Sequence, residues 1–232
     1  MSLDSGTSRP FLALDTSSPT VSVAVAAEDR VLAEEFVAQR ESSSLLLGMV
    51  ENVLGQSGCE LSDLAGVCAL QGPGSFTGLR IGLATTLAFH QSLALPATAI
   101  PTLQVLAAAC AGLPSAIPQD GAQVLAVIDA MRGECFTQGF RVTRSGPIAT
   151  TDPEIKSVAA LSAPPSCTVV GFDIETLLAS AAIPDEQLLS APPLAGLAAL
   201  LAASRNCWDA SSLTRPLYLR PPPASKRLSP AS

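Results

Sequence analysis

The sequence has a single histidine, His90, and its six cysteines stand far apart, at positions 59, 68, 110, 135, 167 and 207. It contains no histidine pair and no paired cysteine spacing, so it offers no recognisable zinc site and no cysteine–histidine or serine–histidine arrangement for nucleophilic catalysis. Several cysteines stand in apolar runs, which favours free buried thiols in a reducing cytoplasm.

Charge is also scarce. Charged residues make up 14% of the 232 positions, and acidic residues outnumber basic ones by 20 to 13, for a net charge of −7. Nucleic-acid surfaces need clustered Lys and Arg, so broad phosphate binding by this chain alone is disfavoured. Among the basic residues near the C-terminus, Arg215, Arg220, Lys226 and Arg227, the only aromatic residue is Tyr218. A solvated tail is therefore preferred over a tRNA contact.

Long apolar runs are missing, although 48% of the residues are hydrophobic. The Ala- and Leu-rich run 194–203 is too short to span a bilayer, and Met1 to Pro10 lacks the apolar core of a signal peptide. We therefore expect no membrane association. An apolar excess with few surface charges is compatible with a buried partner interface.

The most informative stretch is Gly72-Pro73-Gly74-Ser75-Phe76-Thr77-Gly78-Leu79-Arg80-Ile81-Gly82. It follows an apolar run, Val67 to Leu70, and precedes an apolar-periodic run, which predicts a strand, a tight loop and a helix with Ser75 as N-cap. The glycines permit a sharp turn, and the loop either cradles an anion or is a simple turn. Its glycine spacing is not a dinucleotide fingerprint, and no Lys follows as in a phosphate-binding loop.

Glycines recur inside the predicted helix. Gly78 and Gly82 lie four apart on one helical face, close to Thr85, and each costs about 1 kcal/mol relative to alanine. Something is expected to approach this backbone closely: either the chain's own sheet or a helix of another protein. The preceding helix, which is expected to start among residues 42–44 and to end near Gly58, carries more apolar residues than one stripe requires. It is either buried on two sides within its own domain or presents a second surface to a partner.

The pattern predicts three strands, then helix, strand, helix and strand, which is typical of a mixed sheet covered by helices. The first strands are expected at 11–14, 21–26 and 31–38, with later ones at 67–70 and 97–100. A second run has expected strands at 124–128, 135–142, 148–151 and 168–171, and expected helices at 154–162, 173–181 and 194–205. No internal sequence repeat is evident.

The stretch Gly72 to Gly82 resembles the signature of the TsaB-type subunit of the bacterial tRNA threonylcarbamoyladenosine complex. The resemblance runs in order from Phe11 to Arg220. Supporting segments are Leu12-Ala13-Leu14-Asp15-Thr16-Ser17, Arg40-Glu41, Leu46-Leu47, Met49-Val50, Val127-Ile128-Asp129-Ala130, Gly133-Glu134 and Pro216-Leu217-Tyr218-Leu219-Arg220. The chain departs from the family at Ser42, where a histidine is frequent, and at Arg132, which is displaced by one position.

The resemblance implies an α/β fold with two lobes of the actin/sugar-kinase/Hsp70 type (ribonuclease-H-like), with mixed sheets flanked by helices. The expected lobes are 10–103 and 104–220, followed by a disordered tail at 221–232. The implied role is a noncatalytic subunit that dimerises with and activates a catalytic paralogue (TsaD-like), with an ATPase subunit (TsaE-like) joining the pair. ATP and metal are expected on those partners, with no cofactor, metal or catalytic residue on this chain. It would contact tRNA indirectly and could form a homodimer when alone.

Two sets of site residues follow from these considerations. The predicted partner-binding residues are Leu45, Leu46, Met49, Val53, Phe76, Thr77, Gly78, Arg80, Ile81, Gly82 and Thr85. A vestigial nucleotide site would comprise Asp15, Thr16, Ser17, Gly72 and Gly74.

The alternative function is a nucleotide-binding ATPase or phosphotransferase of the actin-like superfamily, with Asp15 near a metal. For Asp15 an Asx-turn is preferred, since one carboxylate is a poor magnesium site. Asp129 and Glu134 are expected to serve turns and strand-edge contacts rather than acid–base chemistry.

Overall fold

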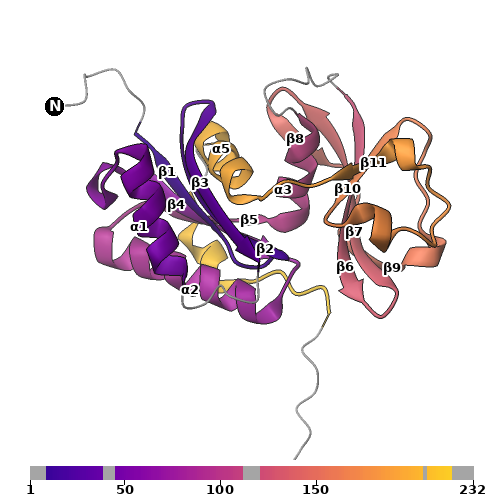
Figure 1. Cartoon of the computed structure of the whole chain (residues 1–232), viewed down its shortest axis with the longest axis horizontal. Coiled ribbons are helices and arrows are strands. Elements are labelled where there is room, and N and C mark those ends of the chain that lie inside the picture. Colours follow the sequence, from indigo (N-terminus) through magenta and orange to yellow (C-terminus); the bar gives the residue numbers. More distant parts are fainter. Residues whose placement is uncertain (1–8, 39–44, 112–120, 206–207, 221–232) are drawn as a thin grey trace, which may run out of the picture.

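The computed structural model describes residues 9–38, 45–111, 121–205 and 208–220, and its helices and strands form two sheets side by side (Figure 1). Arg40-Glu41, the serines at 42–44, Cys207 and the expected tail lie outside the described residues. The main elements are β1 (Phe11–Asp15), β2 (Thr20–Ala27), β3 (Arg30–Ala38), α1 (Leu46–Ser57), β4 (Gly66–Gly72), α2 (Phe76–Leu93), β5 (Ala97–Pro101), α3 (Thr102–Ala108), β6 (Gln123–Met131), β7 (Glu134–Thr143), β8 (Gly146–Ala149), β9 (Glu154–Ser157), β10 (Cys167–Gly171), α4 (Ile174–Leu177), β11 (Leu188–Ser190), α5 (Ala195–Arg205) and the short 3₁₀ helix η6 (Ala210–Thr214).

The two sheets share one topology. The first has the order β3-β2-β1-β4-β5, and the second has the order β11-β10-β6-β7-β8, with β9 added beside β7. In each sheet, three successive antiparallel strands are followed by two parallel ones, because β4 pairs in parallel with β1 and β10 pairs in parallel with β6. The second lobe therefore repeats the first in topology, although the sequence shows no repeat. The expected mixed sheets flanked by helices are confirmed.

The alternation along β2 sorts large and small side chains to opposite faces of the first sheet. Val21, Val23 and Val25 belong to the core that includes α1, whereas Ala24 and Ala26 belong to the core that includes α5. Successive side chains of a strand point to opposite faces, so one strand contributes to two cores. Helix α5 has the sequence AGLAALLAASR, and small residues on both sides allow it to lie close to the sheet.

The two lobes exchange helices. Helix α3 directly follows the first sheet but packs on β6, β7 and β8 of the second. Helix α5 follows the second sheet but packs on β1, β2 and β4 of the first, and η6 packs on β5 and α2. Figure 1 shows α3 and α5 between the two sheets. The expected second lobe, 104–220, is thus not one spatial unit, because its last part completes the first lobe.

Helices α1 and α2 cover the other face of the first sheet, on the side away from the second lobe (Figure 1). Helix α1 lies over β2 and β3, while α2 lies over β1, β4 and β5, so the two are neighbours on that face. Their apolar sides form one core with the large side chains of the sheet.

One expected helix is wrong. Residues 154–157 form strand β9, paired with β7, and only a 3₁₀ turn follows at Val158–Ala160. Ile155 lies opposite Phe136 across this pair and is packed against the core between the lobes, so sheet pairing prevails over a weak helical pattern. The helix expected at 173–181 is reduced to α4, while that expected at 194–205 is confirmed as α5.

Within the part of the chain that the structure describes, no helix combines the length and apolar character needed to cross a membrane.

Candidate functional site

The glycine-rich stretch joins β4 to α2 as expected. The Ser75 hydroxyl accepts a hydrogen bond from the amide of Gly78 (3.3 Å), which confirms Ser75 as the N-cap. Gly72 has a φ of +108°, and a Cβ there would lie 2.8 Å from the carbonyl oxygen of Leu217. A Cβ at Gly74 would lie 2.8 Å from the carbonyl oxygen of Ser17. Both glycines are therefore required by close approaches within this chain.

The glycines inside α2 also face the chain itself. The Thr16 hydroxyl donates to the carbonyl of Gly78 (2.6 Å), and a Cβ at Gly82 would lie 2.5 Å from Thr16 Oγ1. Gly78 and Gly82 are buried under the turn between β1 and β2. Of the two alternatives, close approach by the chain's own sheet region is correct for this pair. Contact of Gly78 and Gly82 with a partner stays a prediction.

Asp15 forms the expected Asx-turn. Its Oδ1 accepts the amides of Ser17 (2.9 Å) and Ser18 (3.2 Å) and the Ser17 hydroxyl (3.0 Å). The side chain is fully buried, and this burial raises its pKa even though hydrogen bonds from Ser18 and Ser17 oppose the shift. Asp15, Thr16 and Gly72 are closed off from solvent, and only Ser17 and Gly74 of the proposed nucleotide set line an open cavity.

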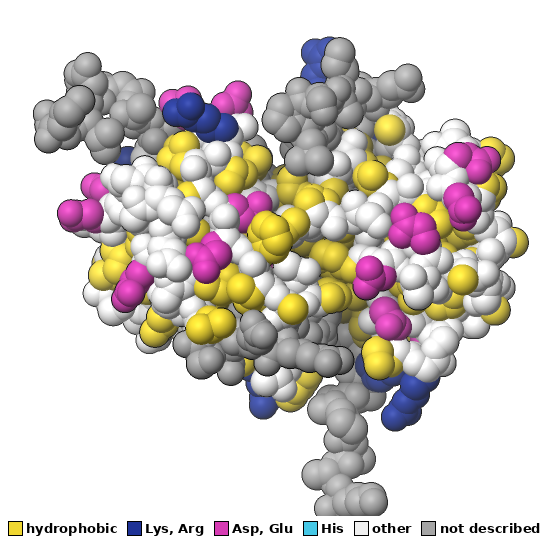
Figure 2. Space-filling view, in the orientation of Figure 1, with side chains coloured by type: hydrophobic (Ala, Val, Ile, Leu, Met, Phe, Trp, Pro, Cys, Tyr) yellow, Lys and Arg dark blue, Asp and Glu magenta, His cyan; other side chains and the backbone are white. Residues whose placement is uncertain are grey.

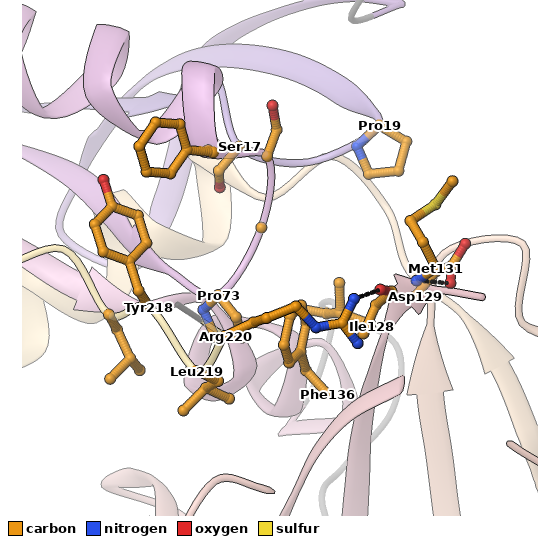
Figure 3. A pocket seen from close by; sticks show the side chains of 15 residues that line it. Ser17, Pro19, Pro73, Ile128, Asp129, Met131, Phe136, Tyr218, Leu219 and Arg220 are labelled. Carbon is orange, nitrogen blue, oxygen red and sulfur yellow. Dashed lines mark hydrogen bonds between the residues drawn. The ribbon is translucent and has the colours of Figure 1, made fainter. Parts of the chain in front are cut away.

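That cavity lies between the lobes and has a volume of about 520 Å³. Figure 3 shows residues of both lobes around it, with Tyr218 and Pro73 facing Met131 and Asp129. Apolar groups dominate its wall. The lining residues are Ser17, Pro19, Pro73, Gly74, Ser75, Phe76, Ile128, Asp129, Ala130, Met131, Phe136, Leu217, Tyr218, Leu219 and Arg220.

The segment 215–220 bridges the two lobes beside this cavity. On the first lobe, Gln71 donates its side-chain amide to the carbonyl of Arg215 (2.9 Å) and accepts the amide of Leu217 on its own carbonyl (2.8 Å). On the second lobe, Arg220 donates to the carbonyl of Ala130 (3.0 Å) and to the carboxylate of Glu134. The family-like C-terminal motif therefore serves as an interlobe strap.

The acidic residues of the second lobe have the structural roles expected for them. Asp129 accepts the amide of Met131 (2.6 Å) at the end of β6, where the turn to β7 begins, and Glu134 pairs with Arg220. The basic residue Arg215 is held by Asp209 (2.9 Å) on the surface. His90 lies near the end of α2, and its Nδ1 is 2.6 Å from the carbonyl oxygen of Leu95. A carbonyl only accepts, so Nδ1 carries the proton in this contact.

Helix α1 separates its apolar residues into two sets. Leu46, Met49 and Val53 are buried against the first sheet, so these predicted partner contacts are instead part of the lobe's own core. Leu45 and Leu47 point outward, with 44% and 60% of their side chains exposed. Leu45 therefore remains a candidate for partner contact, and Leu47 joins it.

Two further glycines on α1 were missed by sequence reasoning. A Cβ at Gly48 or at Gly55 would have no heavy atom of the described residues within 4 Å. The two are seven residues apart and so share one face of the helix. Each weakens the helix by up to about 1 kcal/mol relative to alanine, and no residue that the structure describes fills the space they leave. Their seven-residue spacing in the sequence was the available signal, but it is less conspicuous than the four-residue spacing of Gly78 and Gly82.

The outward side of α2 completes this surface, which we call the outer helix face: Leu45, Leu47, Gly48, Gly55, Phe76, Thr77, Arg80 and Ala84. Phe76, Thr77, Arg80 and Ala84 are exposed. The predicted contacts Ile81 and Thr85 are half-buried, and Ile81 packs against the core beneath. Arg80 lies over the ring of Phe76, with its guanidinium carbon 4.5 Å from the ring centre.

The sequence matches a family model described as "TsaD: tRNA N6-adenosine threonylcarbamoyltransferase" over residues 34–177, which is more than half of the chain. Proteins named "tRNA threonylcarbamoyladenosine biosynthesis protein TsaB" are similar as well. The one from Escherichia coli K12 is 34% identical over 59% of this chain, and that from Bacillus subtilis 168 is 36% identical over 55%. The chain belongs to the TsaB/YeaZ family.

The matched regions span only about half of these relatives, 57% of the E. coli protein and 53% of the B. subtilis protein. Structural similarity covers more of the chain than these sequence matches do. The structure titled "YeaZ from Pseudomonas aeruginosa" has a TM-score of 0.75 to this chain, covering 90% of it and 99% of the other, at 24% identity. This likeness concerns the fold, and with the family match it confirms the expected fold class.

Proposed function

We propose that this chain acts in the formation of threonylcarbamoyladenosine in tRNA, as a noncatalytic subunit that binds and activates a TsaD-like catalytic paralogue. The names of its family relatives support the pathway. A TsaE-like ATPase would join the pair in the cytoplasm, with ATP and metal held by the partners. The transferred group would pass to the adenosine next to the anticodon, and this chain would contact tRNA mainly through the complex.

The open glycines of α1 carry the argument for a partner surface. Gly48 and Gly55 give up helix stability without serving any contact in the described part of the chain. Leu47 lies next to Gly48 and is 60% exposed. A helix of another protein that crosses here can approach the backbone closely and bury Leu47, which accounts for both features. The same face could pair with a second copy when the partner is missing.

The residues of this chain that carry chemistry support an accessory role. His90 is engaged with a backbone carbonyl, and Asp15 with the turn that follows it. Among the described residues, no three His, Cys, Asp or Glu side chains come together in a way that could hold a metal ion. What this chain supplies, in our proposal, is therefore a surface.

The test measures affinity for the purified TsaD-like partner of the same organism by calorimetry, together with the partner's transfer rate. Leu47→Arg and Gly48→Leu should each weaken binding by at least about tenfold, as loss of a central contact does, and lower activation in parallel. Ile148→Arg is the matched control, since Ile148 is also an exposed apolar residue (49%) but lies on β8 of the second lobe. Equal effects of Leu47→Arg and Ile148→Arg would refute the assignment of the face.

The alternative, a nucleotide-dependent phosphotransferase, makes a different prediction. It requires binding of ATP with magnesium to the isolated chain, lost in Asp15→Ala. Asp15 is fully buried and does not line the interlobe cavity, so we expect calorimetry to show no such Asp15-dependent binding.

A further inference from the structure

Three large exposed hydrophobic side chains gather at the interlobe cavity. Phe76, Met131 and Tyr218 are 38%, 66% and 37% exposed, and all three line it. They come from α2, the end of β6 and the strap, so three separate parts of the chain place apolar surface at one opening (Figure 3). Such a concentration in a cavity of about 520 Å³ is typical of a ligand site of small-molecule size.

The first-lobe wall carries two neighbouring aromatic rings that are tilted relative to each other. The rings of Phe76 and Tyr218 have centroids 5.0 Å apart at 32° to each other, and Arg80 covers one face of Phe76. Across the cavity lie Met131 and Phe136. An aromatic platform with an adjoining arginine is the arrangement that stacks an unpaired base. Along the sequence Tyr218 stands alone among the C-terminal basic residues, and the fold brings it together with Phe76 and Arg80.

The polar groups of the cavity favour a hydrogen-bond donor on the ligand. Asp129 uses Oδ1 to accept the amide of Met131, and its second oxygen takes part in none of the hydrogen bonds described. A carboxylate accepts only, so its natural partner is an amino group. Arg220, the cation inside the cavity, is already engaged by Glu134 and Ala130.

The charges limit how much nucleic acid can bind. The chain carries a net charge of −7, which opposes a long phosphate track. On the face in Figure 2, acidic side chains are scattered over both lobes, whereas basic ones lie toward the upper and lower edges. Arg80 on α2 and Arg132, next to Met131 in the β6–β7 turn, are exposed. These two can meet the phosphates of one or two nucleotides.

We propose that the interlobe cavity binds one unpaired nucleobase bearing an exocyclic amino group, presented by single-stranded RNA. The base stacks beside Phe76 and Tyr218, and its amino group donates to Asp129. This inference rests on the proposed function in one respect: tRNA would be the RNA concerned.

The sequence provides a convenient probe, because Tyr218 is its only tyrosine. The full chain with ¹³C-labelled tyrosine gives the ring signals of that residue alone. We would titrate it, with a chelator present, against adenosine, cytidine and uridine monophosphates and a short single-stranded RNA. A ring-current shift that saturates at millimolar adenosine or cytidine monophosphate, and at several-fold lower RNA concentration, is expected. Uridine monophosphate should bind more weakly.

Three variants sharpen the test. Phe76→Leu should weaken binding by about fivefold or more through lost stacking, whereas Phe36→Leu, at an aromatic residue that is 59% exposed on β3, should not. Asp129→Asn keeps an acceptor for the Met131 amide but presents a donor to the ligand, so it should shift preference toward uridine. The Trp208 signal, from the only tryptophan, reports in each case that the fold is intact.

The proposal is overturned if no nucleotide or RNA moves the Tyr218 signals, or if the preference does not respond to Asp129→Asn. A shift produced only by the TsaD-like partner would make the cavity a protein contact instead. Failure of the proposed function would show itself in a different measurement. Leu47→Arg would then leave partner binding unchanged, independently of the result of the nucleotide titrations.

Discussion

Gly82 and Thr16 form the tightest contact in the glycine-rich region. A methyl group at Gly82 would meet Thr16 Oγ1 at 2.5 Å, and that hydroxyl also bonds the carbonyl of Gly78. The prediction is that Gly82→Ala destabilises the chain by about 1–3 kcal/mol through overpacking. Thr16→Ala removes the clashing atom, so the double variant should be less destabilised than the sum of the single ones. Urea unfolding of the three variants measures this, and strict additivity would contradict it.

The same contact changes how variants of this region are interpreted. A bulky residue at Gly78 or Gly82 would disturb the turn between β1 and β2 before it reached any partner. Loss of binding in such a variant would therefore not identify an interface. Leu47 and Gly48 are better positions, because their side-chain space is open.

Asp15 gives a pH-dependent prediction. Burial raises the pKa of this carboxyl in the folded chain above its unfolded value, so its contribution to stability is complete below about pH 4 and is lost as pH rises through the folded pKa. Asp15→Asn keeps Oδ1 as acceptor for Ser17 and Ser18 without the charge. The variant should be more stable than the parent at neutral pH, with the difference vanishing near pH 4. Urea unfolding across this range tests the point, and a less stable variant at neutral pH would contradict it.

Among single residues, sequence reasoning succeeded where the chemistry is local. Ser75 as N-cap and Asp15 in an Asx-turn depend on neighbours within a few positions. The role of Gly82 depends on Thr16, which lies 66 positions earlier, and no periodicity reveals that contact. For the same reason, the aromatic pair of Phe76 and Tyr218 could not be predicted.

At the level of elements, α1 buries apolar residues on its inner side, whereas two glycines on its outer side lower its helical stability. We predict that Gly48→Ala and Gly55→Ala each stabilise the isolated chain by about 0.5–1 kcal/mol, because both positions are helical and have free space. Thermal or urea unfolding would measure the gain. If either substitution were destabilising, the space at that glycine would not be free, and the argument for a partner helix would lose its support.

Helix and strand positions were predictable where the hydrophobic pattern was strong. Strands β1, β2, β4 and β5 lie close to the expected ranges, because a strand buried on both faces has a nearly continuous apolar sequence. Helix α2 does so as well, because its apolar residues recur with the helical period. Residues 154–157 illustrate the limit. Four residues are too few to show a period, and their pairing with β7 decides their structure.

At the scale of the whole molecule, the exchange of α3 and α5 makes the lobes interdependent. A fragment of residues 9–111 would expose the face of the first sheet that α5 covers, including Ala13, Ala24 and Leu70. We predict that this fragment does not fold cooperatively alone and that a peptide of residues 191–220 restores folding when added. Circular dichroism during denaturation tests both statements. Cooperative unfolding of the fragment by itself would show that the lobes are independent.

The sequence could not reveal this exchange, because α3 and α5 follow their strands at ordinary spacing. From the sequence alone, an apolar helix suits the sheet that precedes it as well as the sheet that follows it. Only the arrangement of both sheets decides between the two. A boundary near residue 103 was therefore reasonable along the chain, but it does not separate two bodies in space.

The late position of α5 has a consequence for synthesis on the ribosome. Strand β5 ends at Pro101, whereas α5 begins at Ala195. At a translation rate of about 5–20 residues per second, the intervening residues take on the order of 5–20 s to emerge. Throughout that interval, one apolar face of the first sheet stays uncovered in the nascent chain. The nascent polypeptide is then a natural client for chaperones that hold such surfaces until the last helix arrives.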